Sequence, residues 1–252
     1  MKILSIVNQK GGVGKTTTSI NLSACLYKMK RRVLLVDLDP QSNATRGSGI
    51  DASMIQNSIN DVLLDRVHIE KAIIKSQFDG YDILPATPSL TESEVVLVTR
   101  DEREFILKNK LTSILSRYDY VLMDCPPSLN ILTVNSLVSA TGVLIPVQCE
   151  FYALQGLSEL INTINQIQNT SNQKLKIEGI LRTMFDSRNN LSNDVSDQLK
   201  EHFPGELYKT KIPRNIRVAE APSFGKSILE YDGLSKGSLS YYSLSGEIIK
   251  DE

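Results

Sequence analysis

The sequence contains few cysteines, and they form no pattern. Cys25, Cys125 and Cys149 are an odd number, and no C-x-x-C or histidine-rich spacing relates them. A disulfide framework or a structural zinc site would need cysteines at regular spacings. This absence argues against both kinds of site and favours a reducing, cytoplasmic setting.

Long apolar runs and an excess of one charge are absent as well. The apolar run at residues 3–7 is too short for the core of a signal peptide, and no later segment approaches the ~20 apolar residues that cross a bilayer. We therefore expect a soluble cytoplasmic protein without a membrane partner. Lys and Arg total 28 against 29 Asp and Glu, a formal charge of −1. Any affinity for nucleic acid must therefore come from a local basic patch.

The sequence does contain apolar, β-branched runs that alternate with helical patterns. Several runs are apolar throughout, which is typical of strands buried on both faces. Between them, stretches such as 154–167 repeat apolar residues three or four apart. The alternation predicts an α/β fold with a mostly parallel β-sheet and helices on both faces, in one domain over residues 1–252. The predicted strands lie at 3–7, 32–37, 81–86, 118–124, 142–147, 177–185 and 207–213.

Residues 45–115 are the least regular part of the sequence. They predict helices added to one edge of the sheet, including a helix within 100–117. The helix after the first strand is expected to turn Ile20, Ala24 and Tyr27 inward.

A glycine-rich turn joins the first predicted strand to this helix, within VNQKGGVGKTTT at 7–18. Gly11, Gly12 and Gly14 allow backbone N–H groups to converge on phosphate oxygens, because no Cβ blocks the approach. Lys15 is predicted to reach the β- and γ-phosphates and Thr16 to ligate Mg²⁺. The helix adds the positive end of its dipole to the same site.

The turn departs from two common glycine patterns. The strict G-x-x-x-x-G-K-[ST] pattern fails because residue 9 is Gln, and the dinucleotide pattern G-x-G-x-x-G fails because residue 17 is Thr. The turn also carries a second lysine, Lys10. Most lysines are simply solvated, but Lys15 already serves the nucleotide within its own subunit. Lys10 is therefore either a surface lysine or a cation that acts on a nucleotide held by a partner chain.

Acidic residues follow two other predicted strands. The strand at 32–37 runs into Asp37 and Asp39, and the strand at 118–124 ends at Asp124. The carboxyl edge of a parallel sheet is where such folds bind ligands. Asp39 is suited to orienting the water that attacks the γ-phosphate, and Asp124 to holding Mg²⁺ through a water. Asp37 either joins this site or only caps a loop.

The segment KGGVGKTT, with its leading lysine, resembles the deviant Walker A motif of the ParA/MinD ATPases. The segments VLLVDLDPQSNAT, DCPPSL, VQCEFYALQGL and IPRNIRVAEAPSFGKSI are similar to the ParA/Soj partition ATPases. The resemblance implies a P-loop NTPase that binds ATP and Mg²⁺ and forms an ATP-dependent homodimer. That dimer binds double-stranded DNA non-specifically and associates with the nucleoid. A ParB-like partner then stimulates hydrolysis and releases the DNA.

The resemblance also implies roles for individual residues. Lys10 contacts phosphate across the dimer interface and acts with Lys15 and Asp39 in catalysis, while Asp124 belongs to the Walker B motif. The remaining nucleotide contacts are Gly11, Gly12, Val13, Gly14, Thr16 and Thr17 in the loop, with Met184, Pro213 and Asn215 near the adenine. Thr16 also holds the metal.

Two arginines, Arg188 and Arg217, match the positions that bind DNA in the family. The residues support this in part, because the segment 208–228 has five basic residues and one acid. Such a patch, doubled in a dimer, would bind phosphates with an affinity that falls steeply in salt. No element that reads base edges is evident, so binding should be independent of sequence. The alternative is a solvated surface with scattered lysines.

Three other functions compete with DNA partition. A MinD-like division-site ATPase needs a basic amphipathic C-terminal helix, whereas the tail, predicted as a helix with Leu239, Tyr242 and Ile249 inward, has Lys250 as its only basic residue after Lys236. The nitrogenase iron protein needs cysteines that bridge a cluster, which Cys25 and Cys125 do not resemble. A ParA-like ATPase that positions another cargo on the nucleoid shares the same catalytic core.

Overall fold

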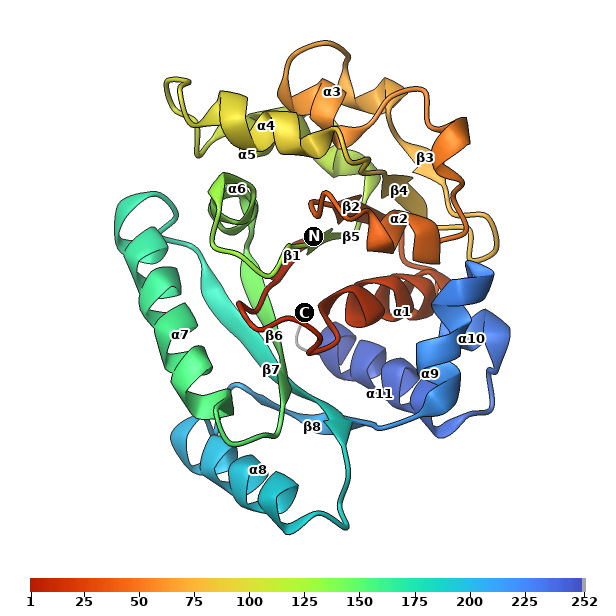
Figure 1. Cartoon of the computed structure of the whole chain (residues 1–252), viewed down its shortest axis with the longest axis vertical. Helices are drawn as coiled ribbons and strands as arrows, with labels where there is room; N and C mark the ends of the chain where they lie inside the picture. The colour runs from red at the N-terminus through yellow and green to blue at the C-terminus, as the bar shows by residue number, and fades with distance from the viewer. Residues whose placement is uncertain (251–252) are drawn as a thin grey trace.

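The computed structural model describes residues 1–250 and has an eight-stranded sheet at its centre (Figure 1). Seven strands are parallel, and β3 runs antiparallel to its neighbour β4 at one edge. The predicted mostly parallel sheet is therefore confirmed. Across the sheet the order is β3 (Ile74–Lys75), β4 (Asp82–Leu84), β2 (Val33–Asp37), β5 (Tyr120–Asp124), β1 (Lys2–Ile6), β6 (Gly142–Gln148), β7 (Lys176–Phe185) and β8 (Leu207–Pro213).

Helices cover both faces of the sheet, as predicted (Figure 1). One face carries α3 (Ile59–Leu63), α4 (Leu90–Leu97), α5 (Ile106–Thr112), α6 (Ile131–Ser139), α7 (Ala153–Thr170) and α8 (Asn190–His202). The other carries α1 (Lys15–Lys28), α2 (Asn43–Gly47), α9 (Ile216–Glu220), α10 (Ile228–Tyr231) and α11 (Lys236–Lys250). Short 3₁₀ turns lie at Ala52–Met54, Ile69–Lys71, Leu115–Arg117 and Ala221–Phe224.

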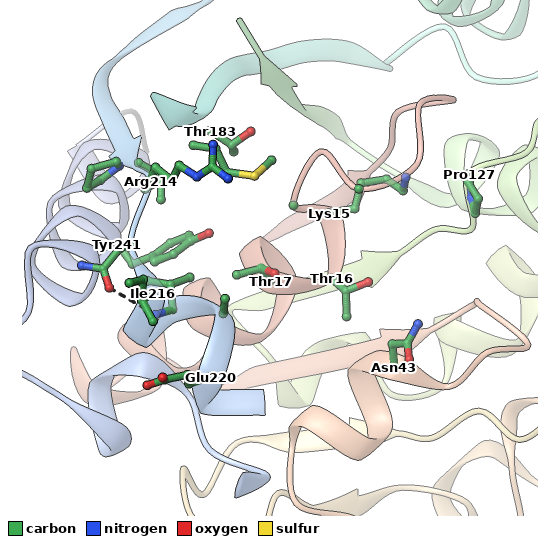
Figure 2. Close-up of a pocket in the computed structure, with 18 of the residues that line it drawn as sticks. Lys15, Thr16, Thr17, Asn43, Pro127, Thr183, Arg214, Ile216, Glu220 and Tyr241 are labelled. Carbon is green, nitrogen blue, oxygen red and sulfur yellow. Dashed lines mark hydrogen bonds between the residues drawn. The ribbon is translucent and has the colours of Figure 1, made fainter. Parts of the chain in front are cut away.

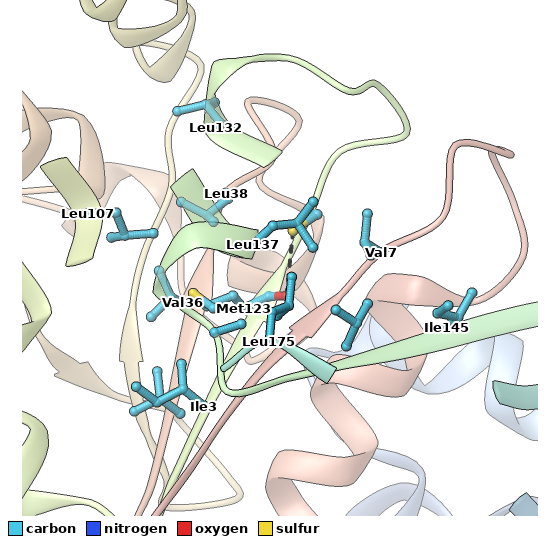
Figure 3. Close-up of a cluster of buried hydrophobic side chains, with 14 of the residues drawn as sticks. Ile3, Val7, Val36, Leu38, Leu107, Met123, Leu132, Leu137, Ile145 and Leu175 are labelled. Carbon is cyan, nitrogen blue, oxygen red and sulfur yellow. Dashed lines mark hydrogen bonds between the residues drawn. The ribbon is translucent and has the colours of Figure 1, made fainter. Parts of the chain in front are cut away.

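The hydrophobic core has two parts because the central strands are buried on both faces. In β5, Val121 and Met123 join the cluster under α4 to α8, whereas Tyr120 and Leu122 join the cluster under α1 and α11. Figure 3 shows part of the first cluster around Met123. Successive side chains of a strand point to opposite faces, so a continuous apolar run supplies both clusters.

The irregular segment differs from the prediction. Its helices α3, α4 and α5 pack on a face of the sheet, over β2, β4 and β5, rather than at an edge. A sheet edge offers backbone hydrogen bonds but little apolar surface, so apolar helix faces pack on the strands instead. The helix expected within 100–117 is α5 followed by a 3₁₀ turn.

Two helices expose residues that were expected to face inward. In α11, Tyr241, Leu244 and Ile248 are buried, whereas Leu239 is 55% exposed and Tyr242 44%. The buried set has the three- and four-residue spacing of one helix face, and it packs against α1 and β8. Ile249 is partly buried. Asp251 and Glu252 lie outside the described residues.

In α1, Ile20 and Ala24 are buried as predicted, but Tyr27 is 40% exposed. Its ring covers Gly80, where an added Cβ would lie 2.9 Å from the ring. The tyrosine therefore packs beside a glycine at the surface and not in the core.

Candidate functional site

The glycine-rich loop connects β1 to α1 at the carboxyl edge of the sheet. Gly12 and Gly14 have φ of 73° and 89°, a left-handed conformation that favours glycine. A Cβ added to Gly11 or Gly12 would meet nothing within 4 Å, so this side of the loop is open to a ligand. Lys15 is the first residue of α1, and burial lowers the pKa of its ammonium, although the charge of Asp124 opposes this shift.

Neighbouring strands hold the loop in shape. Asn8 donates to the Pro146 carbonyl in β6 at 2.8 Å, and its own carbonyl oxygen accepts the backbone N–H of Lys10 at 3.0 Å. Thr183 at the end of β7 donates to the Val13 carbonyl at 2.7 Å. Neither support could be predicted from the sequence, because Pro146 and Thr183 lie in β6 and β7, which carry no phosphate-binding pattern of their own.

Asp124 ends β5 directly behind the loop. Its Oδ1 accepts a hydrogen bond from Ser19 at 2.8 Å, whereas Oδ2 is buried without a partner among the described residues. Burial, followed by the negative charge of Asp37, raises the pKa of Asp124. An unpartnered buried carboxylate oxygen behind Thr16 fits the hydration shell of a Mg²⁺ ion. The ion would neutralise charge on the β- and γ-phosphates.

Asp37 acts on the loop that carries Asp39. Its fully buried carboxylate accepts the backbone N–H of Asp39 at 3.1 Å and both the N–H and the hydroxyl of Thr45, at 2.8 and 2.7 Å. Of the two roles left open by the sequence, the structure favours loop capping. Asp39 itself, 9% exposed, lines the cleft described next.

A cleft of about 780 Å³ runs along the carboxyl edge of the sheet (Figure 2). In this view Arg214, Tyr241 and Glu220 lie on one side, Asn43 and Pro127 on the other, with Lys15 to Thr17 between them. The structure brings most of the predicted residues together here. The lining includes Gly12, Gly14, Lys15, Thr16, Thr17, Asp39, Met184, Pro213 and Asn215. Further lining residues that the sequence analysis missed include Gln41, Asn43, Pro127, Thr183, Arg214, Glu220 and Tyr241.

The predicted adenine end of the cleft has a defined shape. Met184 has φ of 48°, an uncommon left-handed conformation for a residue other than glycine. Asn215 caps α9, because its side-chain oxygen accepts the backbone N–H of Val218 at 3.3 Å. Pro213 ends β8 two residues before this cap. The strand positions Thr183 and Met184 are adjacent, so one strand end supports the loop and lines the cleft.

Lys10 lies outside the cleft lining. Its Nζ is 2.5 Å from Oε2 of Glu150, just beyond β6, and the two side chains are 41% and 47% exposed. Its backbone carbonyl, in contrast, accepts a hydrogen bond from Lys15 Nζ at 3.1 Å. The ammonium therefore points to the surface and away from its own phosphate loop.

The two arginines predicted to bind DNA are exposed and paired with carboxylates. Arg188, with its side chain 88% exposed, contacts Asp186 at 2.8 Å. Arg217, 57% exposed, contacts Glu220 at 3.1 Å and Asp232 at 3.8 Å. Neither lines the cleft.

Residues 1–250 contain neither a candidate metal cluster nor a helix that could span a membrane. All three cysteines are buried and free of disulfides, and no group of three or more His, Cys, Asp or Glu side chains could hold a metal ion. Within the same residues, no helix is both long enough and apolar enough to cross a membrane.

Comparisons with known proteins agree with the geometry. Residues 1–177 match the family model described as an AAA domain. The chain is 48% identical to the sporulation initiation inhibitor protein Soj of Bacillus subtilis, over 98% of both chains. It is also 48% identical to the chromosome partitioning protein ParA of Myxococcus xanthus, over 99% of this chain and 88% of that protein.

A solved structure extends the comparison to bound ligands. The cobyrinic acid a,c-diamide synthase of Mycobacterium smegmatis, with a bound ATP analogue and magnesium, is 35% identical with a TM-score of 0.87, covering 99% of this chain and 95% of that one. The loop, the acidic strand ends and the cleft are those of a P-loop NTPase. The chain belongs to the ParA/Soj family of partition ATPases, which bind ATP with Mg²⁺ and hydrolyse it.

Proposed function

We propose that this chain is an ATP-timed dimer switch that segregates chromosome or plasmid DNA. In the proposal, residues 1–252 act as one deviant-Walker-A ATPase domain in the cytoplasm. ATP joins two copies, the dimer binds double-stranded DNA without sequence preference and so associates with the nucleoid, and a ParB-like partner stimulates hydrolysis. The similarity to Soj and ParA supports this reading.

The position of Lys10 is the observation that carries the proposal. Its ammonium is exposed, held by Glu150, and absent from the lining of its own cleft. A cation on a phosphate loop that does not face its own nucleotide site is available to a nucleotide held by a second copy. The exposed aromatic residues Phe151 and Tyr152, 75% and 69% exposed, follow Glu150 directly and are suited to an interface.

Within one subunit, the proposed roles follow the geometry of the cleft. The backbone from Gly11 to Thr17 and the Lys15 ammonium bind the phosphates, and Thr16 ligates Mg²⁺ while Asp124 holds one of its waters. Asp39 orients the attacking water. At the other end, Met184, Pro213 and Asn215 contact the adenine.

DNA binding is proposed to use Arg188 and Arg217. Their exposed ion pairs with Asp186 and Glu220 contribute little to stability, so DNA phosphates can replace these carboxylates. Because each dimer would present both arginines twice, binding should be cooperative and fall steeply with salt.

The test measures retention on random-sequence DNA at low salt. With an ATP analogue the wild type should bind, and raising the salt should release it. Changing Arg188→Glu and Arg217→Glu together should weaken retention at least about tenfold, with basal ATP hydrolysis unchanged. A matched control changes Arg32→Glu and Arg66→Glu, two exposed ion-paired arginines elsewhere on the surface, and should retain DNA more strongly than the test variant.

Two results would count against the proposal. Unchanged retention in the Arg188/Arg217 variant would refute the assignment of these arginines. A wild type that hydrolyses ATP but never binds DNA would favour a ParA-like ATPase that carries another cargo. A MinD-like membrane role is disfavoured, because the face of α11 with Tyr241, Leu244 and Ile248 is buried against its own domain and the tail has few basic residues.

A further inference from the structure

Helix α4 contacts the loop that follows β5 at the edge of the cleft. Glu94 in α4 accepts a hydrogen bond from the side-chain amide of Asn130. Neither residue belongs to the phosphate loop, and neither lines the cleft. The contact joins two segments that are separated by 36 residues along the chain.

Asn130 fixes the end of the β5–α6 loop. Its side-chain oxygen accepts the backbone N–H groups of Leu132 and Thr133, both at 3.1 Å, which caps α6. With the oxygen used by the helix, the amide nitrogen must face Glu94. Both ends of the side chain are therefore assigned by their partners.

The loop between Asp124 and Asn130 has little freedom of its own. It contains Pro126 and Pro127, whose rings fix φ, and Pro127 lines the cleft. One end of the loop continues β5 at Asp124. The other end is held by Asn130, so a displacement there is transmitted to Pro127 and toward the metal side of the site.

Glu94 is half-buried, and it lies near enough to Asp39 for the two charges to interact. Burial and then the charge of Asp39 raise the pKa of Glu94, and the hydrogen bond from Asn130 opposes this shift. On its other side α4 is anchored to the rest of the protein, because Ser93 donates to Asn60 at 2.7 Å in a buried contact. The buried side chains of Leu90 and Leu97 also tie α4 to the hydrophobic core, so the helix can serve as a support beside the site.

We infer that Glu94 is a positioning residue for ATP hydrolysis, which acts through Asn130 to hold the β5–α6 loop beside Asp39 and Asp124. The role concerns the chemical step, because the phosphate loop and Lys15 bind nucleotide without it. The inference depends on the ATPase activity alone and not on DNA binding or partition.

The test first breaks the hydrogen bond between Glu94 and Asn130 and then restores it with donor and acceptor exchanged. Asn130→Asp keeps an oxygen that caps α6, but it sets a second carboxylate against Glu94 and breaks the contact. We expect kcat for ATP hydrolysis to fall about tenfold, in keeping with the sensitivity of catalysis to small displacements, while KM stays within twofold. Glu94→Gln alone keeps an acceptor for Asn130 and should stay near the wild-type rate.

The double variant Glu94→Gln, Asn130→Asp decides the question, because the glutamine amide donates to the new carboxylate and restores the contact in the opposite sense. We expect kcat to recover to within about threefold of wild type. The control is Glu92→Gln, on the same helix as Glu94, which loses the ion pair with Arg66 and should leave kcat unchanged.

Three results would overturn the inference: an unchanged kcat in Asn130→Asp, a loss of ATP binding that accounts for its slower turnover, or no recovery in the double variant. Melting temperatures identify any variant that fails to fold. DNA retention measured on the same samples separates this inference from the proposed function. If Asn130→Asp is retained on DNA and hydrolyses ATP at the normal rate, only the role of Glu94 is refuted and the proposed function stands.

Discussion

Lys10 has separate backbone and side-chain functions. Its N–H and carbonyl belong to the loop, where they contact Asn8 and Lys15, whereas its ammonium contacts Glu150 at the surface. An exposed ion pair of this kind contributes at most about 1 kcal/mol. Removing the side chain should therefore leave the loop intact.

We predict that Lys10→Ala prevents ATP-dependent dimerisation while the free energy of unfolding changes by less than about 1 kcal/mol. One subunit should still bind ATP, because Lys15 remains. Light scattering with an ATP analogue measures the dimer, and urea unfolding measures stability. Glu150→Gln removes the same ion pair but keeps the ammonium, so this variant should still dimerise. A Lys10→Ala protein that dimerises normally would exclude a role for this lysine across the interface.

A site residue can be predicted from the sequence when it belongs to a motif of neighbouring residues. Gly12 to Thr17 lie in one contiguous motif, and Asp39 and Asp124 directly follow apolar strands, so pattern and spacing suffice. Thr183 supports the loop from 170 residues away, and Glu94 approaches from a helix in the least regular segment. Such contacts depend on three-dimensional packing, which a single sequence does not specify.

At the scale of elements, strands were easier to predict than helix orientations. A buried parallel strand is apolar at every position, so it can be predicted without deciding which residues face which side of the sheet. The edge strand β3 has two residues and no such run. Helix α11 carries apolar or aromatic residues on more than one side, including Leu239, Tyr241 and Leu244, so its inward face was assigned wrongly.

The corrected orientation of α11 gives a stability prediction. Leu244→Ala removes a fully buried side chain from the contact with α1 and β8 and should cost about 2–5 kcal/mol. Leu239→Ala, on the 55% exposed position of the same helix, should change stability by less than about 0.5 kcal/mol. Urea unfolding followed by circular dichroism measures both. Equal costs would mean that the helix packs with a different face inward.

At the scale of the whole molecule, the residues proposed to bind nucleotide and the residue proposed to orient the attacking water come from different elements around the cleft. Lys15 and the phosphate loop lie on β1 and α1, whereas Asp39 comes from the loop after β2. That loop is held by Asp37 through Thr45. Removing the Asp39 carboxylate loses the hydrogen bond from the Gln41 N–H at 2.9 Å but keeps the contacts of Asp37, so the binding surface should stay in place.

We predict that Asp39→Ala binds ATP, loses most of its hydrolysis and accumulates as a dimer on size-exclusion chromatography with ATP and Mg²⁺. The loss follows because no carboxylate remains to orient the attacking water. Lys15→Ala is the control, since without its ammonium the protein should neither bind ATP nor dimerise. An Asp39→Ala protein that stays monomeric with bound ATP would contradict the water-orienting role.

The burial of the cysteines has a practical consequence for thiol chemistry. Burial raises the pKa of Cys25 to about 12 and those of Cys125 and Cys149 to about 11, and all three thiols are inaccessible. Thiolates are the species that react with maleimides and disulfides, so the native protein should label slowly. A single cysteine introduced at the exposed position of Phe151 would then react alone, and its cross-linking would report whether two copies meet through this segment.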